Sequence, residues 1–101
     1  MRRYQQRVDA NQPAIVAAFR AMGCSVAVLN DLVDIAIGYG GISMLCEIKD
    51  GNKPLKKGRQ ADFHANWTGG IRLVRSVDDV PPTVETLKRW HSAIVQRGTS
   101  P

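Results

Sequence analysis

The fold of this chain is decided by residues 30–49, NDLVDIAIGYGGISMLCEIK. Two runs rich in Val, Ile and Leu flank Gly40 and Gly41, and two adjacent glycines supply the positive φ angles that a two-residue hairpin turn requires. Counting outward from that turn along both strands places Asp34 opposite Glu47. The stretch therefore predicts a tight β-hairpin whose register is fixed by its glycines.

Successive side chains of a strand point to opposite faces of the sheet, so the hairpin has one apolar and one mixed face. The uniformly apolar face, which we expect to form the core, comprises Ile35, Ile37, Met44, Cys46 and Ile48. The other face comprises Asp34, Ala36, Leu45, Glu47 and Lys49. The ionisable groups of the hairpin are thus expected to share one face.

The opposed carboxylates of Asp34 and Glu47 require compensation. Cross-strand Cβ atoms lie about 5 Å apart, and two like charges at that distance repel by roughly 3 kcal/mol at an effective dielectric constant of about 20. A divalent cation bound by both carboxylates, or a raised pKa of one of them, relieves this repulsion, and Lys49 adds a positive group beside the pair. The alternatives are a solvated strand face, or a β-bulge that shifts the register.

Length and composition indicate one domain spanning residues 1–101, with residues 1–8 and 98–101 as loose ends. Apolar residues make up 44% of the chain and charged residues 23%, as is typical of soluble globular proteins. No apolar run reaches the length of a membrane span, and the basic N-terminal residues have no apolar segment behind them. We therefore expect a cytoplasmic protein with no membrane partner.

The formal net charge of +5 favours a polyanionic partner, most commonly nucleic acid. Residues 50–59 combine turn-forming residues with four positive charges, which predicts a loop directly beyond Lys49. A solvated basic loop is the simpler interpretation, whereas its position beside the acid pair favours contacts with phosphates. The candidate nucleic-acid-binding residues are Arg2, Arg3, Lys53, Lys56, Lys57 and Arg59.

The two cysteines, Cys24 and Cys46, lie among apolar residues of predicted strands, which predicts two reduced, buried thiols. Together with the two histidines, His64 and His91, they do not form the spacing of a zinc finger, so zinc is not expected.

Hydrophobic periodicity and turn signals predict the remaining elements. Helices are expected over residues 12–22, 60–67 and 83–96, strands over 24–29 and 71–74, and a turn over 76–82. Thr83 is expected to cap the last helix, whose buried stripe would be Val84, Leu87, Trp90, Ile94 and Val95. This order, helix, three strands, helix, strand and helix, predicts an α/β fold with a small mixed sheet flanked by helices.

Three features of this layout resemble the PD-(D/E)XK nuclease superfamily. They are Asp34, the triplet Glu47-Ile48-Lys49 on the next strand, and Gln60 at the start of the following helix. The resemblance is closest to the VRR-NUC and Holliday-junction-resolvase-like branch, in its small phage or prophage members, and it covers residues 9–80. It implies a restriction-endonuclease-like αβββαβ core and a bacterial or phage-infected cell as the setting.

The resemblance implies hydrolysis of DNA phosphodiester bonds with Mg²⁺ or Mn²⁺ and with no organic cofactor. Asp34, Glu47 and the backbone carbonyl of Ile48 would hold the metal, since hard cations prefer oxygen ligands. Lys49 would stabilise developing negative charge, and Gln60 would position the water or the phosphate. Without the resemblance, Gln60 reads equally well as an ordinary residue at a helix start.

Two departures from the family pattern concern the metal site. Val33 stands where relatives usually have Pro, a change that affects only the stiffness of the strand. The first predicted helix has no acidic residue, so either Asp9 or Asn11 substitutes or one metal position is absent. The number of metal ions is therefore left open.

Three further residues are given structural interpretations. His64 is expected to be a packed or partly exposed histidine with no catalytic part. Trp67 and Trp90 are expected to anchor the core, with base stacking as the alternative for an exposed Trp67.

The leading hypothesis is a structure-selective endonuclease acting on branched or junction DNA as a homodimer, because symmetric cleavage of two strands needs two active sites. The competing hypotheses are a non-catalytic DNA-binding or assembly module with a nuclease fold, and a nuclease that acts on RNA. The presence of Asp34, Glu47 and Lys49 together favours catalysis.

Overall fold

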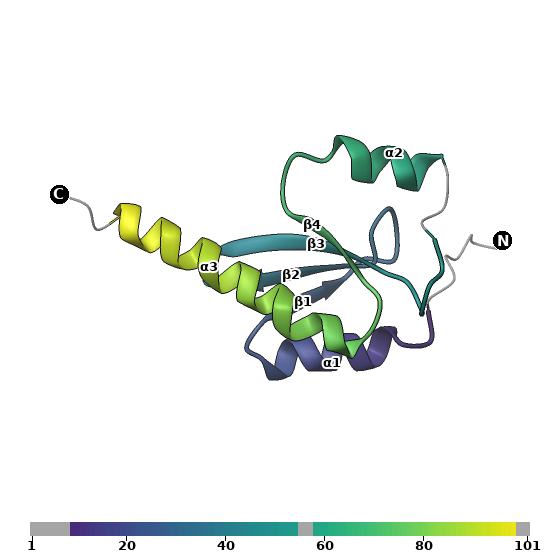
Figure 1. Ribbon diagram of the computed structural model, residues 1–101, viewed down its shortest axis with the longest axis horizontal. Helices are drawn as coiled ribbons and strands as arrows, with labels where there is room; N and C mark the ends of the chain where they lie inside the picture. The colour runs from purple at the N-terminus through teal and green to yellow at the C-terminus, as the bar shows by residue number, and fades with distance from the viewer. Residues whose placement is uncertain (1–8, 55–57, 99–101) are drawn as a thin grey trace, which may run out of the picture.

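The computed structural model describes residues 9–54 and 58–98, and its ribbon is drawn in Figure 1. The elements in chain order are α1 (Gln12–Ala21), β1 (Ser25–Val28), β2 (Ile35–Tyr39), β3 (Ile42–Ile48), α2 (Arg59–Asn66), β4 (Ile71–Val74), the 3₁₀ helix η1 (Val77–Asp79) and α3 (Val80–Gly98). The order of helices and strands predicted from the sequence is therefore confirmed, with boundaries that differ by at most three residues.

The four strands form one mixed sheet in the order β1-β2-β3-β4. The first three strands are antiparallel neighbours, and β4 returns through α2 to lie parallel to β3. In the hairpin, Tyr39 pairs with Ile42 across Gly40 and Gly41, which have φ angles of 56° and 85°. The glycine turn thus sets the register of the β2-β3 ladder as predicted.

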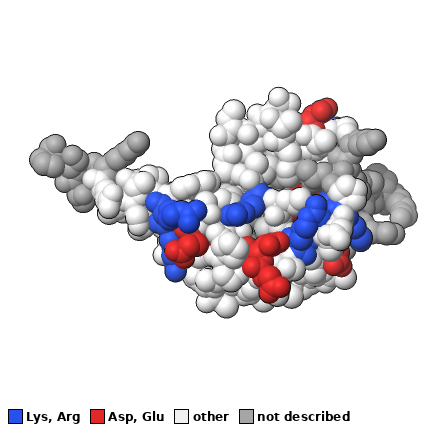
Figure 2. Space-filling model, in the orientation of Figure 1, with Lys and Arg blue, Asp and Glu red and all other residues white. Residues whose placement is uncertain are grey.

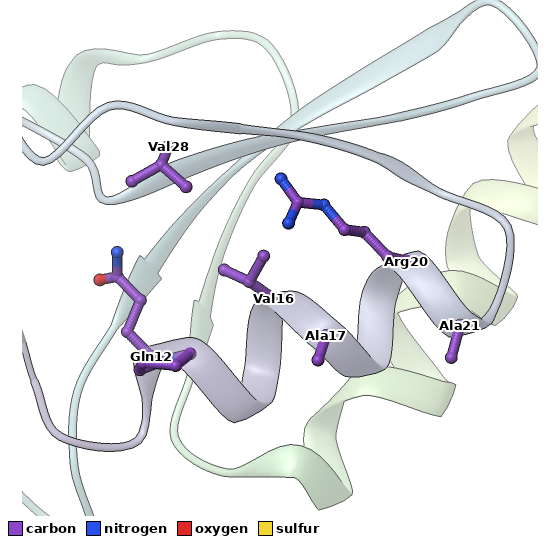
Figure 3. A pocket seen from close by; sticks show the side chains of 7 residues that line it. Gln12, Val16, Ala17, Arg20, Ala21 and Val28 are labelled. Carbon is purple, nitrogen blue, oxygen red and sulfur yellow. The ribbon is translucent and has the colours of Figure 1, made fainter.

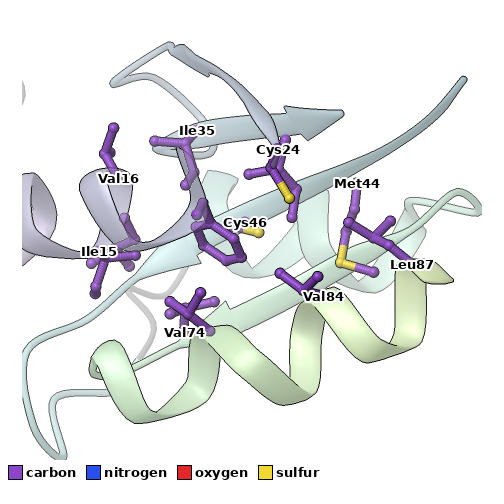
Figure 4. Close-up of a cluster of buried hydrophobic side chains, with 13 residues drawn as sticks. Ile15, Val16, Cys24, Ile35, Met44, Cys46, Val74, Val84 and Leu87 are labelled. Atoms are coloured by element: carbon purple, nitrogen blue, oxygen red, sulfur yellow. The ribbon is translucent and has the colours of Figure 1, made fainter. Parts of the chain in front are cut away.

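Helices α1 and α3 cover one face of the sheet, and α2 lies on the other side (Figure 1). The core forms between α1, α3 and the predicted apolar face of the hairpin, as Figure 4 shows for the side chains around Ile35 and Cys46. All five residues of that face are at most 3% exposed. Because this face of the hairpin is buried against helices, its second face is left for the ionisable groups.

Both cysteines are free and buried, as predicted. Burial raises the pKa of the Cys46 thiol to about 12 and also raises the pKa of Cys24. No helix within residues 9–54 and 58–98 is long and apolar enough to cross a membrane.

The predicted start of the last helix at Thr83 is wrong. Ser76 accepts a hydrogen bond from the backbone of Asp78 and caps η1, which runs directly into α3 at Val80. Pro81 and Pro82 occupy the first turn of α3, where a missing N–H is tolerated. Thr83 is fully buried inside the helix, and its hydroxyl donates to the carbonyl of Asp79.

The predicted buried stripe of this helix is correct only in its first half. Val84 and Leu87 are fully buried, whereas Trp90, Ile94 and Val95 are 40%, 58% and 46% exposed. The second half of α3 lies at the turn end of the hairpin, where Trp90 and Ile94 line an open pocket with Ile42, and the C-terminal end of the helix continues past the sheet (Figure 1). Trp90 therefore does not anchor the core, and Gly98, expected in a loose end, belongs to α3.

The two turn glycines differ in their surroundings, which allows a matched test of the hairpin. A Cβ added at Gly40 would lie 2.5 Å from the ring of His91 on α3, whereas one added at Gly41 would meet no atom within 4 Å. Gly41→Ala should lower the free energy of unfolding by about 1 kcal/mol, the cost of a positive φ in a residue with a Cβ. Gly40→Ala should cost about 1–2 kcal/mol more, because it also overpacks the contact with His91.

Urea unfolding of the two variants measures this difference, and repeating it in a His91→Ala background provides the control. The extra loss at Gly40 should disappear when the ring is absent. Equal losses for the two variants in the presence of His91 would contradict the packing of α3 on the turn.

Candidate active site

Asp34 is fixed at the entrance of β2 by hydrogen bonds on three sides. Its carbonyl accepts from the N–H groups of Leu29 and Asn30 at 2.8 and 3.0 Å, and its own N–H donates to Cys46 at 3.1 Å. Its carboxylate oxygen Oδ2 accepts from the N–H of Ile48 at 2.7 Å. These bonds hold an acidic side chain that is only 4% exposed.

The expected backbone pairing of Asp34 with Glu47 is not part of the ladder, which ends at the pair Ile35 and Cys46. The reason is that Asp34 directs its N–H to Cys46 and uses its carboxylate to bind the next free N–H of β3, that of Ile48. The side chain thereby reaches the end of β3, where Glu47 lies.

Glu47 is 1% exposed, and its pKa is raised to about 8. Burial is the main cause, followed by the negative charge of Asp34 and a hydrogen bond between the two side chains. Lys49 opposes this shift, since its Nζ lies 3.5 Å from Oε2 of Glu47. The structure therefore brings the three predicted residues together, with the two acids close enough to share a proton.

His64 is a member of this cluster that the sequence interpretation missed. It extends from α2, and its Nε2 lies 3.9 Å from Oε1 of Glu47. Both atoms are buried and have no hydrogen-bond partner within the described part of the chain. Burial, and then the charge of Lys49, lower the pKa of His64, which favours the neutral ring.

Gln60 lies one helical turn before His64 on α2 and is 8% exposed. Residues four apart lie on the same side of a helix, so Gln60 and His64 share the side that faces Glu47. The four-residue spacing from Gln60 is the sequence signal that could have identified His64, because it places both side chains on one side of the helix.

Burial of polar side chains is concentrated at this site. Among the described residues, the buried polar or charged side chains are Gln12, Asp34, Glu47, Lys49, Gln60 and Thr83. Four of these six are the catalytic residues predicted from the sequence. Buried ionisable groups are uncommon unless they are paired or functional, so this concentration marks the site.

Within the described part of the chain, Asp9 and Asn11 make structural hydrogen bonds, and these do not involve Asp34 or Glu47. Asp9 accepts a hydrogen bond from the backbone N–H of Asp50, and the Asn11 side chain donates to the carbonyl of Arg75. They tie the segment before α1 to the chain just beyond β3 and β4. Arg75 in turn donates to the carbonyls of Gly51 and Lys53 and so holds the start of the basic loop.

The predicted nucleic-acid-binding residues are placed only in part. Lys53 and Arg59 are exposed, whereas Arg2, Arg3, Lys56 and Lys57 lie outside the described residues. On the face seen in Figure 2, Lys and Arg side chains alternate with acidic ones along the middle of the molecule. The described basic side chains therefore do not form a continuous positive surface on that face.

The donor set fits a hard cation with few protein ligands. Nowhere in residues 9–54 and 58–98 do three or more His, Cys, Asp or Glu side chains form a group suited to a metal ion. Asp34 and Glu47, with the Ile48 peptide beside them, supply two carboxylates and one carbonyl, and Mg²⁺ is commonly bound by one or two carboxylates and several waters.

A groove of about 640 Å³ lies elsewhere, between α1 and the edge strand β1 (Figure 3). Apolar residues such as Val16 and Val28 dominate its lining, with Gln12 and Arg20 as the polar members. None of the predicted catalytic residues lines it. The buried carboxylates, and not this groove, therefore define the candidate site.

No protein-family model, curated protein or solved structure matches this chain. Any assignment of function thus depends on the residues themselves.

The raised pKa of Glu47 predicts how stability changes with pH in the absence of metal. Between the ordinary value of 4.5 and about 8, the folded state binds more protons than the unfolded state, so the free energy of unfolding should fall as pH rises through this range. Glu47→Gln should remove this slope and be more stable than the wild type at pH 8 by on the order of 3 kcal/mol.

Urea unfolding in EDTA at pH 5, 6.5 and 8 measures the effect, with Glu85→Gln, an exposed position on α3, as the matched control. The control should keep the slope of the wild type. Parallel pH profiles for the wild type and Glu47→Gln would show that Glu47 is already ionised without a cation.

Proposed function

We propose that this protein is a divalent-metal-dependent endonuclease that hydrolyses phosphodiester bonds in DNA, with Mg²⁺ or Mn²⁺ as its cofactor. The observation that carries the proposal is the buried pair of Asp34 and Glu47, with Lys49 3.5 Å from Glu47. Two buried acids destabilise a metal-free fold at neutral pH, and a bound cation would relieve that cost.

The topology supports the same proposal. The element order α1-β1-β2-β3-α2-β4 agrees with the restriction-endonuclease-like core that the PD-(D/E)XK resemblance implies. The acids lie at the start of β2 and near the end of β3, and α2, the crossover helix, carries Gln60 and His64 to the same place. The mixed sheet thus brings together residues that are up to 30 positions apart in the sequence.

Asp34, Glu47 and the Ile48 carbonyl would hold the cation, which when bound polarises the phosphate and increases the acidity of a nearby water. Lys49 is well placed to stabilise negative charge that develops on the phosphate oxygens, because burial strengthens its electrostatic effect. Gln60 orients the water or the phosphate through its side-chain amide.

His64 would contribute to positioning the attacking water. The neutral ring has one acceptor nitrogen, and Nε2 faces Oε1 of Glu47 across 3.9 Å, with neither atom otherwise hydrogen-bonded. A water between these two atoms would satisfy both and be oriented by both. This arrangement explains why two polar atoms are buried without protein partners.

The substrate is proposed to be branched or junction DNA, bound by a homodimer. The net charge of +5 favours a polyanion, and no described element has the docking geometry of a base-reading module in the major groove. Lys53 and Arg59, which both belong to the basic stretch of residues 50–59, would contact phosphates.

Cleavage assays with junction, flap, duplex and single-stranded DNA and with RNA test the function. The wild type should cut structured DNA with Mg²⁺ or Mn²⁺ and be inactive in EDTA. Glu47→Gln and Lys49→Ala should each lower kcat by at least about 100-fold, whereas Glu85→Gln should not change it. Lys49→Ala should leave the Kd for DNA nearly unchanged, since Lys49 is buried beside Glu47.

If the wild type binds DNA but cuts no substrate with either metal, the protein is a binding module and the proposal is wrong. Cleavage that survives Glu47→Gln would show that the chemistry occurs elsewhere. Preferential cleavage of RNA would contradict the assignment of DNA.

The part assigned to His64 has its own test. His64→Ala should reduce kcat by about 10- to 100-fold with little change in KM, because a water-positioning group acts on the chemical step. His64→Gln places an amide near the position of Nε2 and should recover much of the loss. The matched control is His91→Gln on α3. Equal activity of the Ala and Gln variants at position 64 would contradict a hydrogen-bonding role.

A further inference from the structure

Three rings on α2 and its C-cap run from the acid cluster to the surface. His64 lies beside Glu47, and the ring centroid of Phe63 lies 6.4 Å from that of His64. The Trp67 ring is stacked on Phe63, with centroids 5.2 Å apart and planes inclined by 27°. The row therefore ends on an indole close to the proposed site of cleavage.

The indole of Trp67 is held in place yet remains open to solvent. One side stacks on Phe63, and its Nε1 edge lies so close to Gly69 that a Cβ there would be 2.8 Å away. Trp67 is nevertheless 43% exposed. A large apolar ring that is fixed by its neighbours and left uncovered is suited to a flat partner, because binding then costs little side-chain entropy.

The neighbourhood of Trp67 restricts what that partner is. Arg59 at the start of the same helix is exposed and positively charged, Asp62 on that helix is exposed and negatively charged, and the whole chain carries a net charge of +5. A nucleobase presents a flat face and is attached to an anionic backbone. In a duplex, however, both faces of each internal base are already stacked, so only an unpaired base offers a free face.

We propose that Trp67 is a stacking platform for an unpaired DNA base within a few nucleotides of the scissile phosphate, so that the enzyme selects DNA containing unpaired nucleotides. This inference rests on the proposed nuclease function. The successive separations of 3.9, 6.4 and 5.2 Å from Glu47 through His64 and Phe63 to Trp67 place the platform within about five stacked nucleotides, at about 3.4 Å each, of the carboxylates. Flaps and distorted junctions supply such a base, and an intact duplex does not.

The chain contains a matched control for this residue. Trp90, the second tryptophan, is 40% exposed but belongs to α3, which covers the face of the sheet opposite α2, and its ring packs against Gly70. Trp67→Ala and Trp90→Ala thus remove the same side chain at nearly the same exposure, one on the α2 side of the sheet and one on the α3 side. Trp67→Phe keeps a stacking ring. It therefore distinguishes a loss of DNA binding caused by the missing ring from one caused by misfolding.

Binding is measured in EDTA, so that no DNA is cut, using flap DNA, single-stranded DNA and duplex DNA of one sequence. Trp67→Ala should weaken binding of the flap and the single strand by about 5- to 100-fold and change duplex binding by less than about twofold. Trp67→Phe should retain most of the affinity, and Trp90→Ala should match the wild type. In a Trp90→Phe background, the fluorescence of Trp67 should be quenched by single-stranded DNA and much less by duplex.

The outcomes separate the platform from the nuclease function. If cleavage requires metal but the wild type and Trp67→Ala bind every substrate with equal affinity, the stacking platform is wrong and the nuclease function is unaffected. An equal loss on duplex and single strand also overturns it, because Trp67 would then be a general contact. Tighter binding of single-stranded RNA than DNA overturns the assignment of DNA, and no binding to any nucleic acid overturns both proposals.

Discussion

The central constraint on this structure is the burial of two carboxyl groups at the point where β2 begins and β3 ends. Asp34 is held there by the N–H of Ile48, and Glu47 is almost inaccessible to water with Lys49 at 3.5 Å. The hydrophobic core on the opposite face of the hairpin keeps both strands in place. The fold thus maintains an arrangement that disfavours ionisation of Glu47 unless further positive charge is supplied.

This constraint connects the helices to the proposed chemistry. Helices α1 and α3 bury the apolar face of the sheet, which leaves the other face to the ionisable groups and to α2. Because α2 crosses from β3 to the parallel strand β4, it carries Gln60, His64 and Trp67 along the side on which Glu47 lies. A short crossover thereby supplies a polar group, a ring nitrogen and an exposed aromatic surface to one place.

Much of this arrangement could be predicted from local sequence features. Gly40 and Gly41 determined the register because a two-residue turn leaves one way to pair the strands, and strict alternation identified the buried face. The final step failed at Asp34, because counting residues cannot foresee that a side chain takes a backbone hydrogen bond at a strand end. His64 was missed for a related reason, since only the path of α2 brings it to Glu47. Trp90, Ile94 and Val95 repeat at helical spacing, but the sequence does not reveal where the sheet beneath them ends.

The most direct measurement of the central claim is calorimetric titration of the protein with Mn²⁺ at pH 7 in two buffers of different ionisation enthalpy. Because the pKa of Glu47 is raised to about 8 without metal, binding should release close to one proton per chain, and both binding and release should be lost in an Asp34→Asn and Glu47→Gln double variant. Mn²⁺ binding that releases no proton, or that persists in the double variant, would contradict the account.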